Sequence, residues 1–233
     1  MGFFDQYDRF YATSETGPWS RRLNARYEAI IGQNIGLLRH RRVIDVASHD
    51  GRWSFAALKA GCTHVTGIEA REHLVHNSNA TFQAYGVDQA LYRFIRADAL
   101  DALRQQTFEV DTVLLLGFFY HVDCHVQLAS LVAATGAKHI VLDTNIVPDS
   151  QAPNGAAIIE LMNEATDSEG NAFGSEPMTI VGRPSRAAIR LIFRHFGYVD
   201  QEVDWSPYVS NDDALADYYR GERATFVLSR PTE

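Results

Sequence analysis

The sequence predicts an α/β protein built on a mostly parallel sheet, and three observations carry this prediction. Apolar runs of strand length alternate with stretches of helical spacing along most of the 233 residues. Residues 109–117 (EVDTVLLLG) are wholly apolar after Asp111, as in a strand that is covered on both faces. Residues 43–69 follow the order strand, tight loop, helix and strand, which is a complete βαβ unit. We therefore expect helices on both faces of the sheet.

The βαβ unit has features of a nucleotide site. Its first strand (VIDVA) leads into the loop SHDG, in which only Gly51 is free of a Cβ penalty at positive φ. A helix (RWSFAALKA) follows and ends at Gly61. The second strand ends in Glu69, whose carboxylate can accept hydrogen bonds from both hydroxyls of a ribose. The unit predicts a nucleotide-like ligand at the carboxyl ends of the strands.

This arrangement resembles the first motifs of the class I S-adenosylmethionine-dependent methyltransferases. In that family the first strand ends in an acidic residue before a glycine-rich loop, and the second ends in Asp or Glu; Asp45 and Glu69 hold these positions. Ala47 and His49 stand where glycines are usual. The resemblance implies a Rossmann-like sheet of seven strands with a closing antiparallel pair, and S-adenosylmethionine as cofactor. The cofactor contacts that it implies on these motifs are Asp45, Ala47, Ser48, His49, Gly51, Trp53, Glu69 and Ala70.

The resemblance extends to the next two strands. Residues 90–97 form the third strand, after which Asp98 and Ala99 begin a short helix, and the family has at this point an acid that accepts a bond from the adenine amine. The fourth strand ends at Gly117 and Phe118, which complete the expected cofactor contacts. LLLGFFYH and RPSRAAIRLIFRHFGYVD are similar to a subset that includes sugar and natural-product methyltransferases and tRNA wobble-uridine carboxymethyltransferases.

The remaining segments are expected to serve one class I methyltransferase domain over residues 1–233. Residues 1–40 hold an aromatic segment and a helix over residues 21–38, and we expect either a lid over the cofactor or packing on a core edge. Arg26 on that helix could pair with the methionyl carboxylate, since its fork of donors suits that group, or it could be solvated. Residues 147–184 form an insertion whose length is typical of a substrate cap, with a pattern only at AAIIELMNE.

Two sites at strand ends could help to remove a proton from the acceptor, and the first is at the end of the fourth strand. His121 follows the fourth strand and is the expected general base, because the ordinary imidazole pKa of about 6.5 suits proton transfer near neutrality. It could instead begin the next helix and bond a backbone carbonyl. Tyr120 beside it could orient the substrate or pack on the cofactor.

The alternative is a metal at the end of the fifth expected strand, residues 139–142. Asp143 and Asn145 offer oxygen ligands for a hard cation such as Mg²⁺, which would acidify a substrate hydroxyl, with Asp143 as a third catalytic candidate. A capping Asp and a turn Asn are the structural alternative.

Composition narrows the partners. The net charge of −8 argues against nucleic acid, which needs a concentrated basic surface. No apolar run reaches the ~20 residues of a membrane helix. The two cysteines, Cys62 and Cys124, match no metal or redox spacing, and we expect a cytoplasmic protein. The expected function is O-methylation of a hydroxyl on a saccharide or other small metabolite, and the alternative is tRNA wobble-uridine modification. A second copy of the chain, in a homodimer, is the protein partner that we consider.

Overall fold

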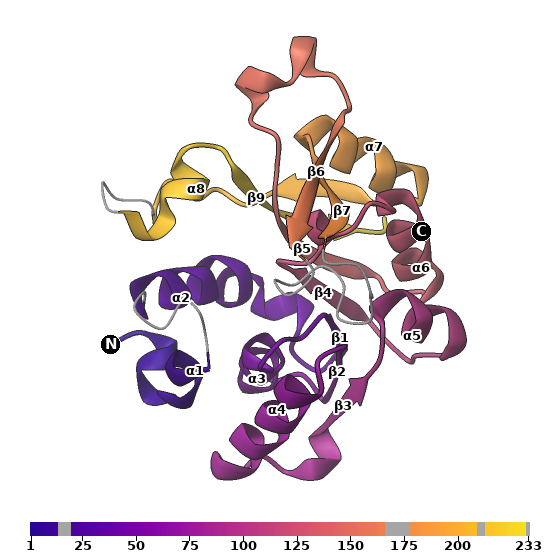
Figure 1. Cartoon of the computed structure of the whole chain (residues 1–233). Coiled ribbons are helices and arrows are strands. Elements are labelled where there is room, and N and C mark those ends of the chain that lie inside the picture. The colour runs from indigo at the N-terminus through magenta and orange to yellow at the C-terminus, as the bar shows by residue number, and fades with distance from the viewer. Residues whose placement is uncertain (14–19, 166–177, 209–212, 232–233) are drawn as a thin grey trace.

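The main sheet has seven strands in the order β3-β2-β1-β4-β5-β9-β8 (Figure 1). The structure, a computed structural model, describes residues 1–13, 20–165, 178–208 and 213–231. Strands β1 to β5 run parallel, and β9 pairs antiparallel with both β5 and β8. The predicted mostly parallel seven-stranded sheet with a closing antiparallel pair is confirmed. The strands are β1 Arg42–Val46, β2 His64–Glu69, β3 Tyr92–Arg96, β4 Thr112–Leu116, β5 His139–Asn145, β8 Val199–Glu202 and β9 Arg223–Ser229.

Helices cover both faces of this sheet, and each face has its own hydrophobic core (Figure 1). On β4, Val113 and Leu115 belong to one core, whereas Leu114 and Leu116 belong to the other. The strand is apolar throughout because neither of its faces meets water. One face carries α3 and α4, and the other carries α5, α6 and α7. Their bounds are α3 Arg52–Lys59, α4 Glu72–Ala84, α5 Ala99–Gln105, α6 His125–Ala134 and α7 Arg186–His195.

The N-terminal aromatic segment packs against α3 through turn η1 (Phe3–Gln6) and helix α1 (Arg9–Ala12). Phe4 and Phe10 have no exposed surface, and the Phe10 ring lies 5.2 Å from that of Phe55. The described part of the segment therefore contributes to the core. Residues 14–19 lie outside the described residues, and the lid stays a prediction.

The helix expected over residues 21–38 is regular only at its start, so that prediction is partly wrong. Helix α2 (Ser20–Arg26) continues as a π-helical turn (Tyr27–Ile31) and a 3-10 segment (Gly32–Leu37). Asn34 has non-helical angles, and its side chain donates to the carbonyl of Ile30 at 3.0 Å. A side chain that bonds backbone carbonyls competes with the regular helical ladder.

The insertion after β5 contains an antiparallel hairpin that the sequence did not predict, of strands β6 (Ile159–Ala165) and β7 (Met178–Pro184). Leu161 is 63% exposed and Ile180 is 53% exposed. Because much of the hairpin meets solvent on both faces, its residues lack the alternation of a half-buried strand. The base of the hairpin packs on the 3-10 turn η5 (Phe119–His121), which directly follows β4.

The chain after the hairpin forms α7 and the closing pair of strands, β8 and β9. Ser185 caps α7 by accepting a hydrogen bond from the Ala188 N–H at 3.2 Å. Between β8 and β9 lie a 3-10 turn (Asp213–Leu215) and helix α8 (Ala216–Tyr219). None of the helices in the described ranges has the length and apolarity needed to cross a membrane.

Candidate active site

The loop between β1 and α3 has the backbone of a glycine-rich loop, although two of its residues carry side chains. The φ angles are +55° at Ala47, +53° at His49 and +76° at Gly51. For the first two residues this left-handed conformation costs about 1–2 kcal/mol each. At Gly51 a Cβ would also lie 2.9 Å from Cζ of Phe94, so this position requires glycine for space as well. Strain of this kind concentrates at binding sites, and here it lies at the carboxyl end of β1.

Glu69 ends β2 beside this loop and is 3% exposed. Its Oε2 accepts from the His49 N–H at 2.9 Å, and its Oε1 accepts from the Arg71 N–H at 2.9 Å. The Arg71 side chain adds contacts from Nε at 2.8 Å and Nη2 at 3.4 Å. A carboxylate has about four acceptor positions. The site fits a ribose diol once the guanidinium of Arg71 moves away, because the two backbone donors leave two positions.

Two more buried carboxylates support the loop. Asp45 accepts a bond from Ser54 Oγ at 2.7 Å, and burial raises the pKa of Asp45 to about 7. Asp50 pairs with Nε of Arg52 at 2.6 Å and accepts a bond from Oγ1 of Thr13 at 2.6 Å. Burial opposes ionisation of Asp50, but the charge of Arg52 outweighs it and holds the pKa of Asp50 well below its usual range. The Thr13 bond ties the N-terminal segment to the loop.

The other predicted cofactor contacts lie at the carboxyl ends of β2, β3 and β4. Asp98 caps α5, and both of its bonds, from the N–H groups of Leu100 (2.9 Å) and Asp101 (3.0 Å), use Oδ1. Gly117 has a φ of +87° and donates its N–H to the Asp143 carbonyl at 2.8 Å. Ala70, Ala99 and Phe118 directly follow Glu69, Asp98 and Gly117 in the chain, whereas Trp53 lies on α3, two residues after Gly51. The sheet thus brings these residues to the carboxyl ends of its parallel strands. Their role in binding the cofactor stays a prediction.

His121 ends turn η5 and is 6% exposed. Its Nδ1 lies 2.6 Å from Oε2 of Glu164, which belongs to β6 of the insertion hairpin. An ionised carboxylate can only accept, so Nδ1 is the donor in this contact. The alternative prediction, a hydrogen bond from His121 to a backbone carbonyl, is not what Nδ1 makes. The Tyr120 ring centroid lies 3.9 Å from that of His121.

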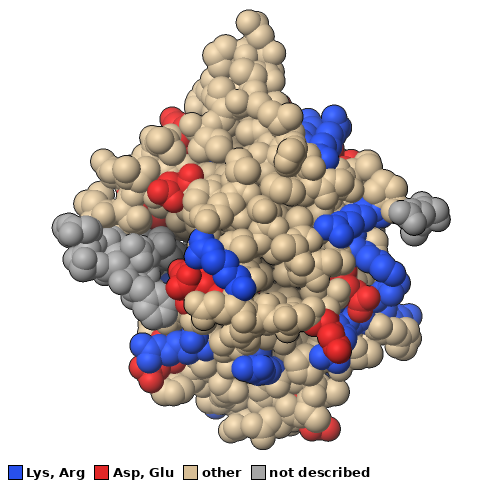
Figure 2. Space-filling view, turned by 90° about the vertical axis from the view of Figure 1, so that its right-hand side faces the viewer, with Lys and Arg blue, Asp and Glu red and all other residues tan. Residues whose placement is uncertain are grey.

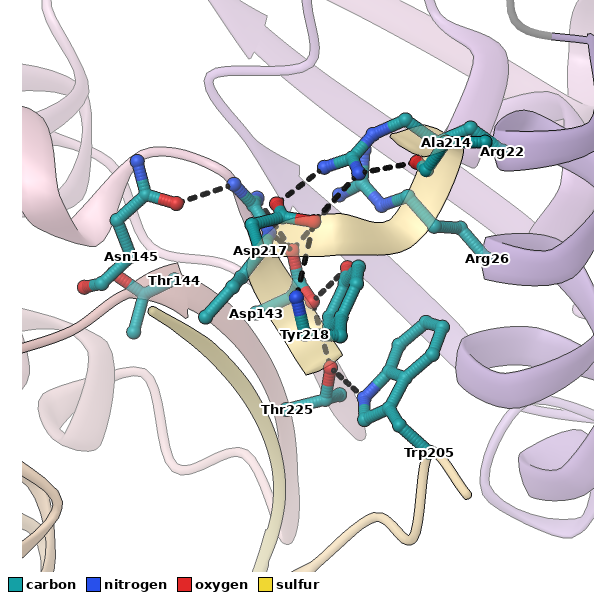
Figure 3. A network of polar contacts seen from close by, with 11 residues as sticks. Arg22, Arg26, Asp143, Thr144, Asn145, Trp205, Ala214, Asp217, Tyr218 and Thr225 are labelled. Carbon is teal, nitrogen blue, oxygen red and sulfur yellow. Dashed lines mark hydrogen bonds and ion pairs between the residues drawn. The ribbon is translucent and has the colours of Figure 1, made fainter. Parts of the chain in front are cut away.

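Asp143 lies at the centre of a buried polar network that joins α2, β5, α8 and β9 (Figure 3). Oδ1 accepts from Nη2 of Arg26 at 2.8 Å and from Nε of Arg223 at 2.7 Å. Oδ2 accepts from the hydroxyls of Tyr218 at 2.7 Å and Thr225 at 2.6 Å. Burial opposes ionisation of Asp143, but the two guanidinium groups lower its pKa well below the usual range. The carboxylate is therefore ionised and fully used.

This network corrects the predicted metal site. The acceptor positions of Asp143 are filled, and Oδ1 of Asn145 accepts from Nη1 of Arg223 at 2.9 Å. Two arginines at these oxygens would repel a cation. No group of three His, Cys, Asp or Glu within the described residues could hold a metal ion. The residues present do not fit Mg²⁺, and a carboxylate with no exposed surface and no open acceptor position does not suit the predicted catalytic role of Asp143.

Arg26 is buried, contrary to the solvated alternative. Its guanidinium carbon lies 5.1 Å from the centroid of the Trp53 ring, and its Nη2 bonds Asp143. Its Nε has no hydrogen-bond partner among the described residues. A buried donor of this kind costs free energy until an acceptor reaches it.

Sequence reasoning missed several residues of the site. Glu164 and His125 tie the hairpin to the strand ends, whereas Arg71, Tyr218 and Arg223 hold buried carboxylates. Arg71 lies two positions after its partner, Glu69, so the local pair of opposite charges in the sequence could have indicated this contact. Partners of the others are 43 to 80 residues away, and no local pattern indicates them.

No protein-family model matches the sequence, and no curated protein sequence matches it. The solved structures that resemble it share the architecture described above. An S-adenosylmethionine-dependent methyltransferase from Mesorhizobium loti has a TM-score of 0.62 at 14% identity, over 88% of this chain and 98% of that one. The N-terminal domain of EvdMO1 with SAH bound has 0.60 at 19%, over 94% and 85%. The chain has the fold of the class I S-adenosylmethionine-dependent methyltransferases.

Two further structures show how widely this fold is used. A methyltransferase in complex with the Trm112 activator of Haloferax volcanii has a TM-score of 0.59 at 16% identity, over 97% of this chain and 98% of that one. The [4+2]-cyclase SpnF has 0.63 at 11%, over 90% and 82%. Because a cyclase has the same fold, the reaction has to be argued from the site.

Proposed function

We propose that the protein is an S-adenosylmethionine-dependent O-methyltransferase that acts on a hydroxyl of a saccharide or another small metabolite. The observation that supports this is the imidazole of His121 at the carboxyl end of β4, with the Glu164 carboxylate at its Nδ1. A hydroxyl has to lose its proton during methyl transfer, and imidazole takes up protons readily near neutral pH.

The residues at the strand ends fit the cofactor. S-adenosylmethionine, when bound, would supply an electrophilic methyl group on a sulfonium sulfur. The acceptor oxygen would bond to the methyl carbon while the carbon–sulfur bond breaks and its electron pair stays on sulfur. Glu69 would hold the ribose hydroxyls and Asp98 the adenine amine. Arg26, with its unpartnered Nε, would bind the methionyl carboxylate, because a buried guanidinium donor gains most from an anionic acceptor.

The acceptor would lie between these residues and the insertion hairpin. His121 would take the hydroxyl proton on Nε2, and Tyr120 beside it would orient the acceptor through its ring or hydroxyl. Such placement of the acceptor oxygen against the methyl group is the main contribution that a protein makes to this kind of displacement.

Charge supports a small acceptor over a nucleic acid. The net charge is −8, and on the face shown in Figure 2 the basic side chains that gather along the right-hand side have acidic side chains among them. A structure of EvdMO1, similar to this chain at 19% identity and a TM-score of 0.61, was determined in the presence of SAH and D-fucose, which favours a saccharide as the first acceptor to test.

The test is methyl transfer from labelled cofactor to a panel of monosaccharides that includes D-fucose, with bulk tRNA as the comparison. We expect label in a saccharide, and His121→Ala should then lower kcat by roughly 10²–10⁴-fold with unchanged cofactor affinity. His195→Ala, at an exposed position on α7, is the control. Label in tRNA alone would favour the wobble-uridine alternative, and cofactor binding without transfer to any acceptor would contradict the proposal.

A further inference from the structure

The insertion hairpin is held to the segment after β4 by two histidines, one at each of its strands. His121 contacts Glu164 of β6 through Nδ1, and His125 contacts the Gly182 carbonyl of β7 through Nε2 at 2.7 Å. His125 is 1% exposed and begins α6. The two contacts leave the hairpin little freedom to shift relative to the carboxyl end of β4.

Packing at the second contact is tight. A Cβ on Gly182 would lie 2.6 Å from Cε1 of His125 and 2.6 Å from Cγ2 of Ile159. The backbone of β7 therefore lies directly against the His125 ring, and only glycine permits this approach. Since β6 pairs with β7 from Ile159 to Ala165, this contact also sets the position of Glu164.

We propose that Glu164 is a positioning residue for His121, so that the insertion supplies part of the proton-transfer machinery in addition to covering the acceptor. The inference rests on the proposed function of His121 as the base. Glu164 is not among the site residues that the sequence or the likeness in fold suggests. Its contact of 2.6 Å with Nδ1 of His121 points to this role.

The carboxylate would act in two ways. By accepting the Nδ1 hydrogen it fixes the ring orientation and the tautomer, which leaves the lone pair on Nε2. When the acceptor hydroxyl transfers its proton to Nε2, and its oxygen forms the new bond to the methyl carbon, the ring becomes a cation that the adjacent carboxylate stabilises. A carboxylate bonded to an imidazole performs this service in hydrolases, where it does not itself become protonated.

The principal test is Glu164→Gln, which keeps the size of the side chain and removes its charge. With the saccharide that gives turnover, kcat should fall about 10- to 100-fold, the loss expected for a hydrogen bond to a charged group. KM and cofactor affinity should change little. Glu160→Gln, on the same strand but paired with Arg183 near the surface, is the matched control and should keep full activity.

A double variant separates positioning from a structural role. In the His121→Ala background, Glu164→Gln should cost nothing more, because a residue that acts only through His121 loses its effect with it. An equal loss in both backgrounds would mean that Glu164 only holds the hairpin, and would overturn the proposal.

A spectroscopic measurement needs no acceptor. Imidazole ¹⁵N shifts of His121, assigned by comparison with His121→Ala, should report hydrogen on Nδ1 in the wild type and a mixed tautomer in Glu164→Gln. An unchanged tautomer together with unchanged kcat would also overturn the inference. A fully active His121→Ala enzyme would instead contradict the proposed base itself, so the two failures are distinguishable.

Discussion

At the scale of single residues, partners decide what a buried carboxylate does. Asp45 and Asp143 are both almost fully buried, near the carboxyl ends of β1 and β5. Asp45 has a serine hydroxyl as partner and its pKa rises to about 7, whereas Asp143 has two arginines and its pKa falls well below the usual range. Burial raises the pKa of both carboxyls, and only at Asp143 do adjacent arginines outweigh it.

Glu69 and Arg71 give a prediction about cofactor binding at this scale. Glu69→Ala should weaken S-adenosylmethionine binding by about 1.5–3 kcal/mol, because the ribose hydroxyls lose a charged acceptor. Arg71→Ala should instead tighten binding by about 0.2–1 kcal/mol, because a partly exposed ion pair no longer has to be broken first. Calorimetric titration measures both. Weaker binding in Arg71→Ala would mean that the guanidinium contacts the cofactor instead of competing with it.

At the scale of elements, the polar network holds the N-terminal helix and the last strands on the sheet. Figure 3 shows Arg22 and Arg26 reaching from α2 toward Asp217 on α8 and Asp143 on β5. Trp205 adds a bond from its ring N–H to Oγ1 of Thr225 at 3.1 Å. The elements it joins are distant in the sequence, so the network fixes how the last strands and α2 meet.

Asp143→Asn tests this role. We expect the free energy of unfolding to fall by about 3–5 kcal/mol, because two buried arginines lose the charge that compensates them. Thermal unfolding with and without Mg²⁺ is the measurement, and added Mg²⁺ should not alter the loss. Asn145→Ala, which removes only one acceptor of Arg223, should cost less. A variant as stable as the wild type would contradict the structural role.

At the scale of the whole molecule, groups with opposite pKa shifts make stability depend on pH in opposite directions. The pKa of Asp143 is lowered on folding, so its contribution is present above the unfolded value of about 3.8 and is lost as the pH falls below it. Burial lowers the pKa of His125, so its neutral form is favoured and stability is lost as the pH falls below about 6.5. The pKa of Asp45 is raised, and its contribution is lost as the pH rises from about 3.8 to about 7.

Asp45→Asn isolates the last of these effects. An amide stays neutral, so the variant should gain stability relative to the wild type as the pH rises from about 3.8 to about 7, the range in which the unfolded carboxyl ionises while the buried one keeps its proton. Melting temperatures of both proteins across this range give the answer. A difference that is constant with pH would mean that folding does not raise the pKa of Asp45.

The sequence by itself determined the strands of the main sheet, the helices α3 to α7 and the loop after β1. Strand and helix periods, the acids at strand ends and Gly51 act over a few neighbouring residues, so their signals are local. The seven-stranded sheet with its closing antiparallel pair then followed from the resemblance that these motifs carry. Even the irregular loop residues, Ala47 and His49, could be placed in this way, although only the structure revealed their positive φ angles.

Tertiary structure decided the chemistry. The sequence offered Asp143 as a metal ligand or catalytic residue and His121 as a base without a partner, because a carboxylate or an imidazole looks the same whatever lies against it. The chain brings Arg223 to Asp143 across 80 residues and Glu164 to His121 across 43. Charge, protonation and hydrogen bonding depend on these neighbours in space, and no periodicity along the chain records which side chains will meet.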